Sequence, residues 1–197
     1  MTDPHQGQNI RHSNRLEGSV VAITGAASGN GRASALRTGR EGAALYISDI
    51  NAEMLEDTLG DLKSEGIDVA GGIFDAANID DAPRFVAAVK DAYGRIDVLV
   101  NNAGAVRIEP FPNVSEENWD WTMNLNLKGA FFLMQEAAKE MIEQRAGNIV
   151  NIASIAGTFG GPTSSPPYAA AKAGLVNLTT VAAAALAQYG IRVNAIA

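Results

Sequence analysis

From Ser19 onward, short runs of β-branched and apolar residues alternate with longer segments of helical periodicity. This alternation is typical of repeated strand–helix–strand units around a parallel sheet. Continuous apolar runs, such as residues 98–100, suit strands that helices cover on both faces. We therefore predict strands at 20–24, 44–49, 69–75, 98–101, 148–152 and 192–196.

The segments between these strands have the periodicity and the end signals of helices. Asn51 and Ser115 can cap the first N–H groups of two of them. We predict an α/β fold with a Rossmann-type, doubly wound parallel sheet, built as a single domain of three α/β/α layers. The predicted helices are 30–41, 52–65, 80–93, 116–143 and 167–189. Glycines follow their ends, where a left-handed residue is favoured, at Gly42, Gly66, Gly94, Gly147 and Gly190.

The length and composition indicate one domain and argue against several functions. With 197 residues and 47% hydrophobic content the chain can bury one core, and its first 16 residues lack the apolar stretch of a signal peptide. We expect a disordered extension at 1–16 and one domain at 17–197. The net charge of −7 argues against nucleic acid and anionic membranes as partners. The most apolar helical run, 181–187, is shorter than a membrane span.

Cysteine is absent from the sequence, and both histidines, His5 and His12, lie in the polar extension. Thiolate metal sites, disulfides and cysteine nucleophiles are therefore impossible, and a Ser/His/Asp or zinc site has no histidine within the domain. We expect no metal site and a cytoplasmic location.

A glycine-rich turn, Thr-Gly-Ala-Ala-Ser-Gly-Asn-Gly at 24–31, joins the first predicted strand to the first helix. Glycines at such a turn let the backbone approach a pyrophosphate closely, and the helix N-terminus offers free N–H donors. The turn therefore predicts dinucleotide binding. An ordinary strand-to-helix loop is the alternative, because a lone glycine pattern is weak evidence.

Asp49 ends the second predicted strand, 24 positions after Gly25. A carboxylate about 20 residues beyond the turn binds the adenosine ribose hydroxyls and would repel a 2′-phosphate. Neither Ala26 nor Ala27 is basic, and Ile50 follows Asp49, so the sequence favours NAD over NADP. The alternative is that Asp49 caps the next helix, although Asn51 can already do so.

Motifs along residues 16–197 resemble those of the short-chain dehydrogenase/reductase family. The glycine turn resembles the family's Thr-Gly-x-x-x-Gly-x-Gly pattern. Asp75 resembles the acidic residue after the third strand, which contacts adenine. Asn-Asn-Ala-Gly at 101–104 resembles the motif that stabilises the central sheet and lines the cofactor site, and Arg-Val-Asn at 192–194 resembles the start of a later strand.

Four further residues, Asn126, Ser154, Tyr168 and Lys172, resemble the family's catalytic tetrad. The resemblance implies that Asn126 has a structural and proton-relay role and that Lys172 binds the nicotinamide ribose. The cofactor contacts assigned from the turn, Asp49 and the resemblance are Gly25, Ser28, Gly29, Asn30, Gly31, Asp49, Ile50, Asp75, Ala76, Asn102, Ala103, Gly104, Ile152, Tyr168 and Lys172.

Tyr168 and Lys172 are four positions apart, so on a helix they share one face. A lysine ammonium favours the phenolate of a neighbouring tyrosine, which can accept an alcohol proton or return it to an alkoxide. The Ser154 hydroxyl can donate to the substrate oxygen as charge develops. The simpler alternatives are two exposed helix residues, a strand-end cap at Ser154, and satisfaction of the helix backbone by Asn126.

The sequence also departs from the family pattern. Asn30 stands where isoleucine is commoner, and the interval from Ser154 to Tyr168 is 14 positions, one longer than is usual in the family. This interval contains Pro162, Pro166 and Pro167. The family continues beyond the position of Ala197, so we expect the 17–197 dinucleotide-binding catalytic domain to lack the usual C-terminal segment.

We predict an oxidoreductase that transfers a hydride between NAD(H) and a small-molecule secondary alcohol or ketone. One alternative is an NADPH-dependent 3-oxoacyl-carrier-protein reductase, which Asp49 disfavours. Another is a non-catalytic dinucleotide-binding sensor or scaffold, which the Tyr168–Lys172 pair disfavours. We expect a homodimer or homotetramer through helices 116–143 and 167–189, because alanines at 182–185 let another helix approach. Trp119, Trp121 and Met123 are interpreted as packing residues.

Overall fold

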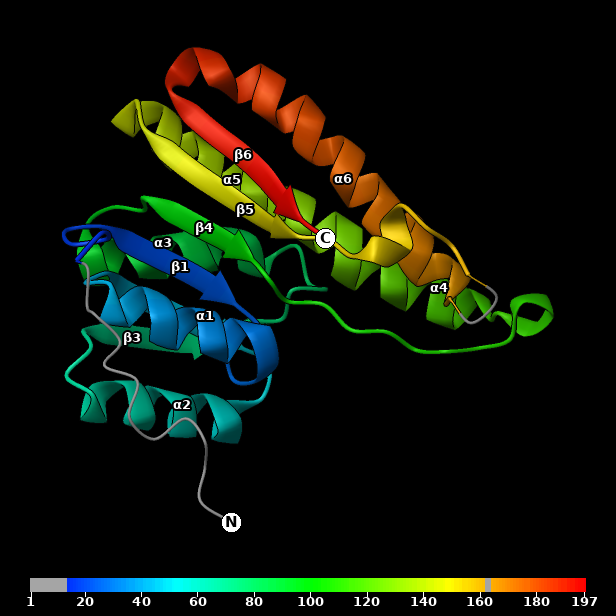
Figure 1. Cartoon of the computed structure of the whole chain (residues 1–197), viewed down its shortest axis with the longest axis horizontal. Coiled ribbons are helices and arrows are strands. Elements are labelled where there is room, and N and C mark those ends of the chain that lie inside the picture. The colour runs from blue at the N-terminus through cyan, green and yellow to red at the C-terminus, as the bar shows by residue number, and fades with distance from the viewer. Residues whose placement is uncertain (1–13, 162–163) are drawn as a thin grey trace.

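The computed structural model describes residues 14–161 and 164–197, so His5, His12 and Pro162 lie outside the described residues. Its centre is a parallel sheet whose strands run in the order β3-β2-β1-β4-β5-β6 (Figure 1). The predicted doubly wound α/β fold is confirmed. The strands are β1 (Val20–Thr24), β2 (Ala44–Asp49), β3 (Val69–Ile73), β4 (Val98–Asn101), β5 (Gly147–Ile152) and β6 (Ile191–Ile196).

Helices join successive strands and form the outer layers (Figure 1). The α-helices are α1 (Gly29–Arg40), α2 (Ala52–Ser64), α3 (Asp81–Tyr93), α4 (Glu116–Met123), α5 (Gly129–Gln144) and α6 (Pro166–Leu186). Short 3-10 helices lie at Phe111–Asn113, Ile155–Gly157 and Ala187–Tyr189. Asn51 and Ser115 cap α2 and α4 as predicted, because their side chains accept from Met54 N and Asn118 N.

Alternate residues of each strand point to opposite faces of the sheet, and two cores result. On one face, Ala22 belongs to a core with side chains of α3 and α5, against which α6 packs. On the other face, Ile23 belongs to a core with α1 and α2. This second layer does not reach β6, where Arg192 and Asn194 are exposed and Ile196 is 58% exposed. The three-layer arrangement is therefore complete only over the β3–β1 half.

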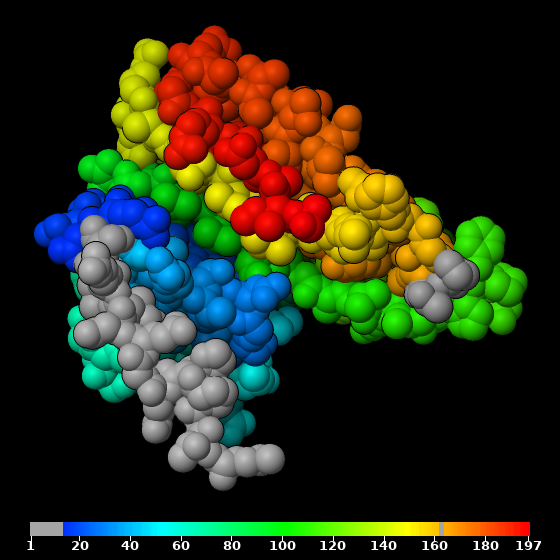
Figure 2. All heavy atoms as spheres, viewed as in Figure 1, coloured from blue at the N-terminus to red at the C-terminus, as the bar shows by residue number. Residues whose placement is uncertain are grey.

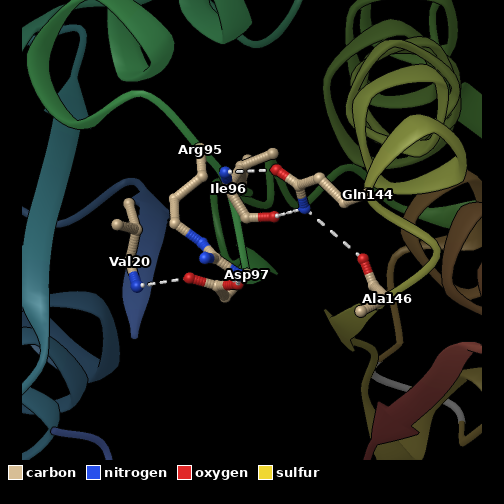
Figure 3. Close-up of polar contacts among 6 residues, drawn as sticks. All are labelled: Val20, Arg95, Ile96, Asp97, Gln144 and Ala146. Carbon is tan, nitrogen blue, oxygen red and sulfur yellow. Dashed lines mark hydrogen bonds and ion pairs between the residues drawn. The ribbon is translucent and has the colours of Figure 1, made fainter. Parts of the chain in front are cut away.

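Polar side chains tie the elements together at the amino end of the sheet, as Figure 3 shows. The Asp97 carboxylate accepts from Val20 N at 2.9 Å and pairs with the Arg95 guanidinium at 2.6 Å. The Gln144 amide accepts from Ile96 N at 3.2 Å and donates to Ile96 O at 2.9 Å. These bonds fix the starts of β1 and β4 against the end of α5. The candidate functional site lies at the opposite edge, where the strands have their carboxyl ends.

The helix predicted at 116–143 is interrupted, which corrects the sequence prediction. A π-helical turn, Asn124–Lys128, separates α4 from α5. The Asn126 side-chain amide donates to Thr122 O at 3.0 Å and so competes for a carbonyl that the helix backbone would otherwise use. The Gly129 N–H instead reaches back to Asn124 O, the five-residue step of a π-turn.

Other boundaries shift by one or two residues. The helix α5 ends in the left-handed region at Arg145, with φ 57°, instead of at the predicted Gly147. Gly147 begins β5, and a Cβ there would lie 2.4 Å from Met141 Sδ, so close packing requires this glycine. The strand β3 ends at Ile73, not at Asp75, because its partner β2 ends at Asp49.

The predicted N-terminal extension includes residues that contact the domain. The Arg15 guanidinium pairs with the Glu41 carboxylate at 2.8 Å, and Leu16 packs against the core that contains α1 and α2. Leu16 N also donates to Glu41 O at 2.9 Å. The structure therefore attaches residues 15 and 16 to the domain, and residues 1–13 are outside the described part of the chain.

One helical segment, Pro166–Tyr189, is long and apolar enough by length and composition to cross a membrane, with 24 residues. It comprises α6 and the following 3-10 turn, and it is longer than the apolar run 181–187 considered from the sequence. In the structure α6 packs along β6 and against the turn at Ile155–Gly157. Its buried face contains Ala171, Lys172, Leu175 and Thr179.

Candidate functional site

The carboxyl ends of β1 to β4 surround a cleft of about 310 Å³. The chain leaves β1 toward β2 on one side and enters β4 on the other, so the strand order reverses here, which is where ligands bind in doubly wound sheets. The lining residues are Gly25, Ser28, Asp49, Ile50, Phe74, Asp75, Ala76, Ala77, Asn102, Ala103, Gly104, Ala105, Trp121 and Leu125.

The glycine turn fits tightly against the segment that follows β4. Gly25 has φ 63°, and a Cβ there would lie 2.8 Å from Ala103 Cα. A Cβ on Gly31 would lie 2.1 Å from Gly25 O. Both positions therefore require glycine to let α1 begin at this place. Ser28, the residue before α1, makes no side-chain cap, so the first N–H groups of the helix are not capped by it.

Asn102 holds the glycine turn in place. Its side-chain amide donates to Thr24 O and to Gly25 O, both at 2.9 Å. In return, the Thr24 hydroxyl accepts from the backbone N–H groups of Asn102 and Ala103 at 3.1 and 3.0 Å. The turns after β1 and β4 are therefore fixed to one another on two adjacent walls of the cleft.

Asp49 places a carboxylate in the cleft. One oxygen accepts from Ala27 N and the other from Asn51 N, both at 3.0 Å. Asn51 itself caps α2, which removes the alternative that Asp49 is the cap of that helix. An ionised carboxylate has about four acceptor positions, so these two bonds leave capacity for hydroxyl donors. Among the described residues that line the cleft, none is a lysine or an arginine.

Asp75 and its neighbours form the next part of the wall. One Asp75 oxygen accepts from Ala77 N at 2.9 Å, which closes a small turn after β3. The α5 backbone approaches this turn so closely that a Cβ on Gly129 would lie 1.7 Å from Ala76 O. The β3 end of the cleft is therefore held by the helix that follows the π-turn.

Lys172 lies on the buried face of α6 and is only 4% exposed. Its ammonium donates to Ile152 O at 2.7 Å and lies 5.6 Å from the centre of the Tyr168 ring. Burial in a weakly polar environment lowers the pKa of the Lys172 ammonium from 10.5 to about 8. The helix thus brings a half-buried phenol and a buried ammonium onto one face, as the four-residue spacing predicts.

Asn126 approaches the same point from the π-turn. Its amide nitrogen donates to Ala105 O at 2.9 Å and to Thr122 O, while its buried Oδ1 has no hydrogen-bond partner within the described residues. A Cβ on Gly104 would lie 2.7 Å from Asn126 Oδ1 and 3.4 Å from Lys172 Nζ. Gly104 therefore lets these two polar atoms lie near one another. The Asn126 amide nitrogen therefore satisfies backbone carbonyls, and its Oδ1 is available to accept a further hydrogen bond.

Ser154 follows β5 and caps the short helix at Ile155–Gly157, because its hydroxyl oxygen accepts from Ala156 N at 3.2 Å. This is the capping role considered from the sequence. The hydroxyl hydrogen is not used by that bond and can still be donated. A Cβ on Gly157 would lie 2.7 Å from the Lys172 carbonyl carbon, so the turn that Ser154 caps packs directly on α6.

The structure separates the predicted cofactor residues into three groups. Those that line the cleft are Gly25, Ser28, Asp49, Ile50, Asp75, Ala76, Asn102, Ala103 and Gly104. Gly29 and Asn30 are exposed at the start of α1, and Gly31 is buried against Gly25. Ile152, Tyr168 and Lys172 lie together on the β5–α6 side, outside the lining of the cleft.

Sequence reasoning missed five residues that line the cleft, namely Phe74, Ala77, Ala105, Trp121 and Leu125. The first three adjoin predicted residues and could have been found by extending each motif by one position. Trp121 and Leu125 are four positions apart, and Leu125 precedes Asn126, so helical spacing was an available signal. The interpretation of Trp121 as a packing residue alone was therefore incomplete.

The pKa shift of Lys172 gives a testable pH dependence of stability. Between pH of about 8 and 10.5 the unfolded chain binds more protons at this residue than the folded chain does, so folding gains stability as pH rises. Relative to Lys172→Met, the wild-type free energy of unfolding should rise by roughly 1 to 3 kcal/mol across this window. Urea unfolding without cofactor at pH 7.5, 9 and 10.5 measures the difference.

The variant Lys63→Met, at an exposed position on α2, controls for titration of the rest of the chain. If the wild-type free energy of unfolding, taken relative to that of Lys172→Met, stays constant or falls as pH rises, the buried, desolvated ammonium is contradicted.

Comparison with known proteins gives the same fold and indicates its chemistry. Residues 19–197 match the family described as short chain dehydrogenase. A (2S)-[(R)-hydroxy(phenyl)methyl]succinyl-CoA dehydrogenase subunit, BbsD of Thauera aromatica, is 42% identical over 182 residues, 92% of this chain and 73% of that protein. The 3-oxoacyl-[acyl-carrier-protein] reductase FabG of Thermotoga maritima is 43% identical over 183 residues, 93% of this chain and 74% of that protein.

Two solved structures are similar over most of the chain and differ in their cofactor. An NAD+-bound xylitol dehydrogenase superposes with a TM-score of 0.89 at 34% identity, over 93% of this chain and 70% of that one. An actinorhodin polyketide ketoreductase with NADPH superposes with a TM-score of 0.86 at 37% identity, over 90% and 68%. The chain therefore belongs to the short-chain dehydrogenase/reductase family, whose members are nicotinamide-dependent oxidoreductases.

Proposed function

We propose that this protein is an NAD(H)-dependent dehydrogenase that interconverts a secondary alcohol and a ketone. The observation that carries the proposal is the placement of Lys172, buried beneath Tyr168 and bonded to Ile152 O at 2.7 Å. A desolvated ammonium beside a phenol can assist proton transfer. Burying this charge also destabilises the folded state, and binding a dinucleotide alone gives no reason to keep it. This consideration disfavours the sensor or scaffold alternative.

The residues of the cleft fit a dinucleotide. Gly25 and Gly104 keep the walls free of side chains at positions where a Cβ would collide with neighbouring atoms, and Gly31 lets the start of α1 pack against Gly25. The uncapped start of α1 suits a pyrophosphate, and Asp49 suits a pair of ribose hydroxyls. When bound, the nicotinamide ring supplies hydride acceptance or donation.

In the proposed reaction, Tyr168 moves the proton. In the oxidation direction its phenolate accepts the proton of the substrate hydroxyl as the carbinol C–H bond gives up its hydride, and in reduction its hydroxyl returns the proton to the carbinol oxygen. Ser154 donates a hydrogen bond to that same oxygen as negative charge develops. The Lys172 ammonium stabilises the phenolate and remains fixed by Ile152 O.

The preference for NAD(H) is proposed from Asp49. Its carboxylate is anchored to the glycine turn through Ala27 N, so it cannot turn away from the adenosine ribose without breaking that bond. A 2′-phosphate would meet this negative charge. The similarity to FabG and to the NADPH-bound ketoreductase supports the alternative, an NADPH-dependent 3-oxoacyl-carrier-protein reductase.

We also propose that two copies associate through α4, α5 and α6. An apolar groove of about 590 Å³ lies between these helices, and its lining includes Leu127, Phe131 and the 57% exposed Val181. The alanines at 182–185 contribute less to the proposed contact than the sequence indicates, because Ala182 and Ala183 pack on the internal core. The remaining alanines of this run are exposed. The groove and this exposed face suit a second copy in a two-fold contact.

The proton-transfer role predicts that Tyr168→Phe lowers turnover at least about 100-fold, because only the transferable proton is removed. Binding of NAD(H) should change less than about threefold, within the context dependence of a single contact. Formation of NADH by the protein over a panel of secondary alcohols measures turnover, and calorimetry measures binding. Tyr189→Phe, outside the site, is the matched control. Near-normal turnover in Tyr168→Phe would rule out this proton donor.

The cofactor assignment predicts tighter binding of NADH than of NADPH, by about tenfold or more, since one repelled phosphate is worth on the order of 1.4 kcal/mol. Asp49→Asn should reduce this ratio, whereas Glu53→Gln, on the exposed first turn of α2, should leave it unchanged. Calorimetric dissociation constants for both cofactors decide the question. Equal or tighter binding of NADPH by the unaltered protein would favour the reductase alternative.

The proposed contact between copies predicts a dimer or tetramer in sedimentation velocity at micromolar concentration. Val181→Glu should shift the protein toward monomer, because association would bury the new carboxylate in an apolar groove. Thr180→Glu, exposed on the same helix and outside the groove, should not. A monomeric wild-type protein, with or without NAD, would contradict the proposal.

A further inference from the structure

Trp121 lines the cleft but belongs to none of the motifs that predict the cofactor site. It lies on α4, one helical turn before Leu125, which also lines the cleft. The Arg107 guanidinium lies over its ring, with the guanidinium carbon 4.0 Å from the ring centre. An indole whose one face is covered by a cation presents its edge or its other face to the cleft.

Arg107 is itself held at both ends. Its carbonyl accepts from the buried Ser165 hydroxyl at 3.0 Å and from the Asn118 side-chain amide at 3.4 Å. Its guanidinium also lies 3.7 Å from the Glu117 carboxylate. In Figures 1 and 2 the segment between β4 and α4 leaves the sheet and runs to the far end of the molecule. The two carbonyl bonds attach it there to α4 and to the start of α6, and so fix the residue that covers Trp121.

The neighbours of Trp121 show which half of a dinucleotide it would meet. The same cleft contains Asp49 and Asp75, at the ends of β2 and β3, the side that takes adenosine in doubly wound folds. Ser154, Tyr168 and Lys172, which carry the proposed chemistry, are not among its lining residues. The lining also includes Gly104 and Ala105, which lie beside Asn126 and Lys172. Leu125, one helical turn from Trp121, shares a smaller hollow with Phe74 and Ala76 at the end of β3, so this face of the helix is directed toward the adenosine side.

We propose that Trp121 contacts the adenosine half of the bound dinucleotide and that Arg107 is a positioning residue that holds the indole in place. This inference rests on the dinucleotide binding in the proposed function. An aromatic ring can stack on a nucleobase, and a guanidinium that lies over the ring restricts the motion of the ring. The pair adds affinity for the adenosine half without touching the reacting atoms.

Fluorescence can test the contact directly, because the chain contains only two tryptophans. Trp119→Phe leaves Trp121 as the sole emitter, and Trp121→Phe leaves Trp119. In Trp119→Phe, saturating AMP or ADP-ribose should change the tryptophan emission by tens of per cent, whereas nicotinamide mononucleotide should not. In Trp121→Phe the same ligands should change the emission much less. A response of Trp121 to the mononucleotide alone, or equal responses in the two variants, would overturn the proposal.

Binding measurements separate this inference from the proposed function. Trp121→Leu should weaken ADP-ribose binding by about 5- to 100-fold, the loss associated with removing a base–aromatic contact, and should leave nicotinamide mononucleotide binding unchanged. If the wild-type protein binds ADP-ribose and NAD but Trp121→Leu binds ADP-ribose equally well, this inference fails and the proposed function stands. If the wild-type protein binds none of these ligands by calorimetry, both fail.

Arg107 is tested through the motion of the ring. In the Trp119→Phe background, Arg107→Ala should lower the steady-state anisotropy of Trp121 and weaken ADP-ribose binding, while Arg107→Lys should restore part of both because it keeps the cation. A purely structural role would alter the thermal midpoint and the binding of both half-ligands together. Unchanged anisotropy and ADP-ribose affinity in Arg107→Ala would remove Arg107 from the proposal.

Discussion

The site depends on the Asn102 side chain, which bonds two loops that are far apart in the sequence. Its amide donates to Thr24 O and Gly25 O, and the Thr24 hydroxyl accepts from the backbone after β4. A turn with three glycines has high conformational entropy when unfolded, so it needs such external bonds to keep one geometry. Because β1 and β4 are neighbours at the reversal of strand order, one amide positions both walls of the cleft.

A second buried polar chain extends this order to the side that carries Lys172. The Asn101 amide donates to Asn151 Oδ1 at 2.9 Å, and the Asn151 amide donates to the Thr179 hydroxyl at 2.9 Å. Thr179 in turn donates to Leu175 O on α6 at 2.7 Å. The chain therefore connects β4, β5 and α6 through groups that are satisfied inside the core. Satisfied buried networks specify one packing arrangement, and this one sets the position of α6 against the sheet.

Most of the fold could be predicted from local chemistry, because the apolar strand runs and the caps at Asn51 and Ser115 act within a few residues. The four-residue spacing of Tyr168 and Lys172 likewise fixes a shared helix face. The π-turn could not be predicted from periodicity, since it depends on the Asn126 side chain, which bonds to Thr122 O within the helix and to Ala105 O, 21 positions earlier. The place of Trp121 in the wall of the cleft also depends on a residue distant in the sequence, because Arg107, in the segment after β4, lies over its ring. This contact leaves no periodic pattern in the sequence.

The two sides of the site differ in their electrostatics, and the fold maintains the difference. Carboxylates at the ends of β2 and β3 face the cleft, whereas the ammonium of Lys172 is buried beside β5. Burial lowers the pKa of Lys172 to about 8, which still leaves the group predominantly charged at neutral pH. A charge held in a weakly polar environment acts more strongly on a neighbouring phenol than one in water does. Burial of the Lys172 ammonium destabilises the folded chain. The same burial supports the proposed role of the ammonium, because the charge that stabilises the Tyr168 phenolate is already oriented before a substrate arrives.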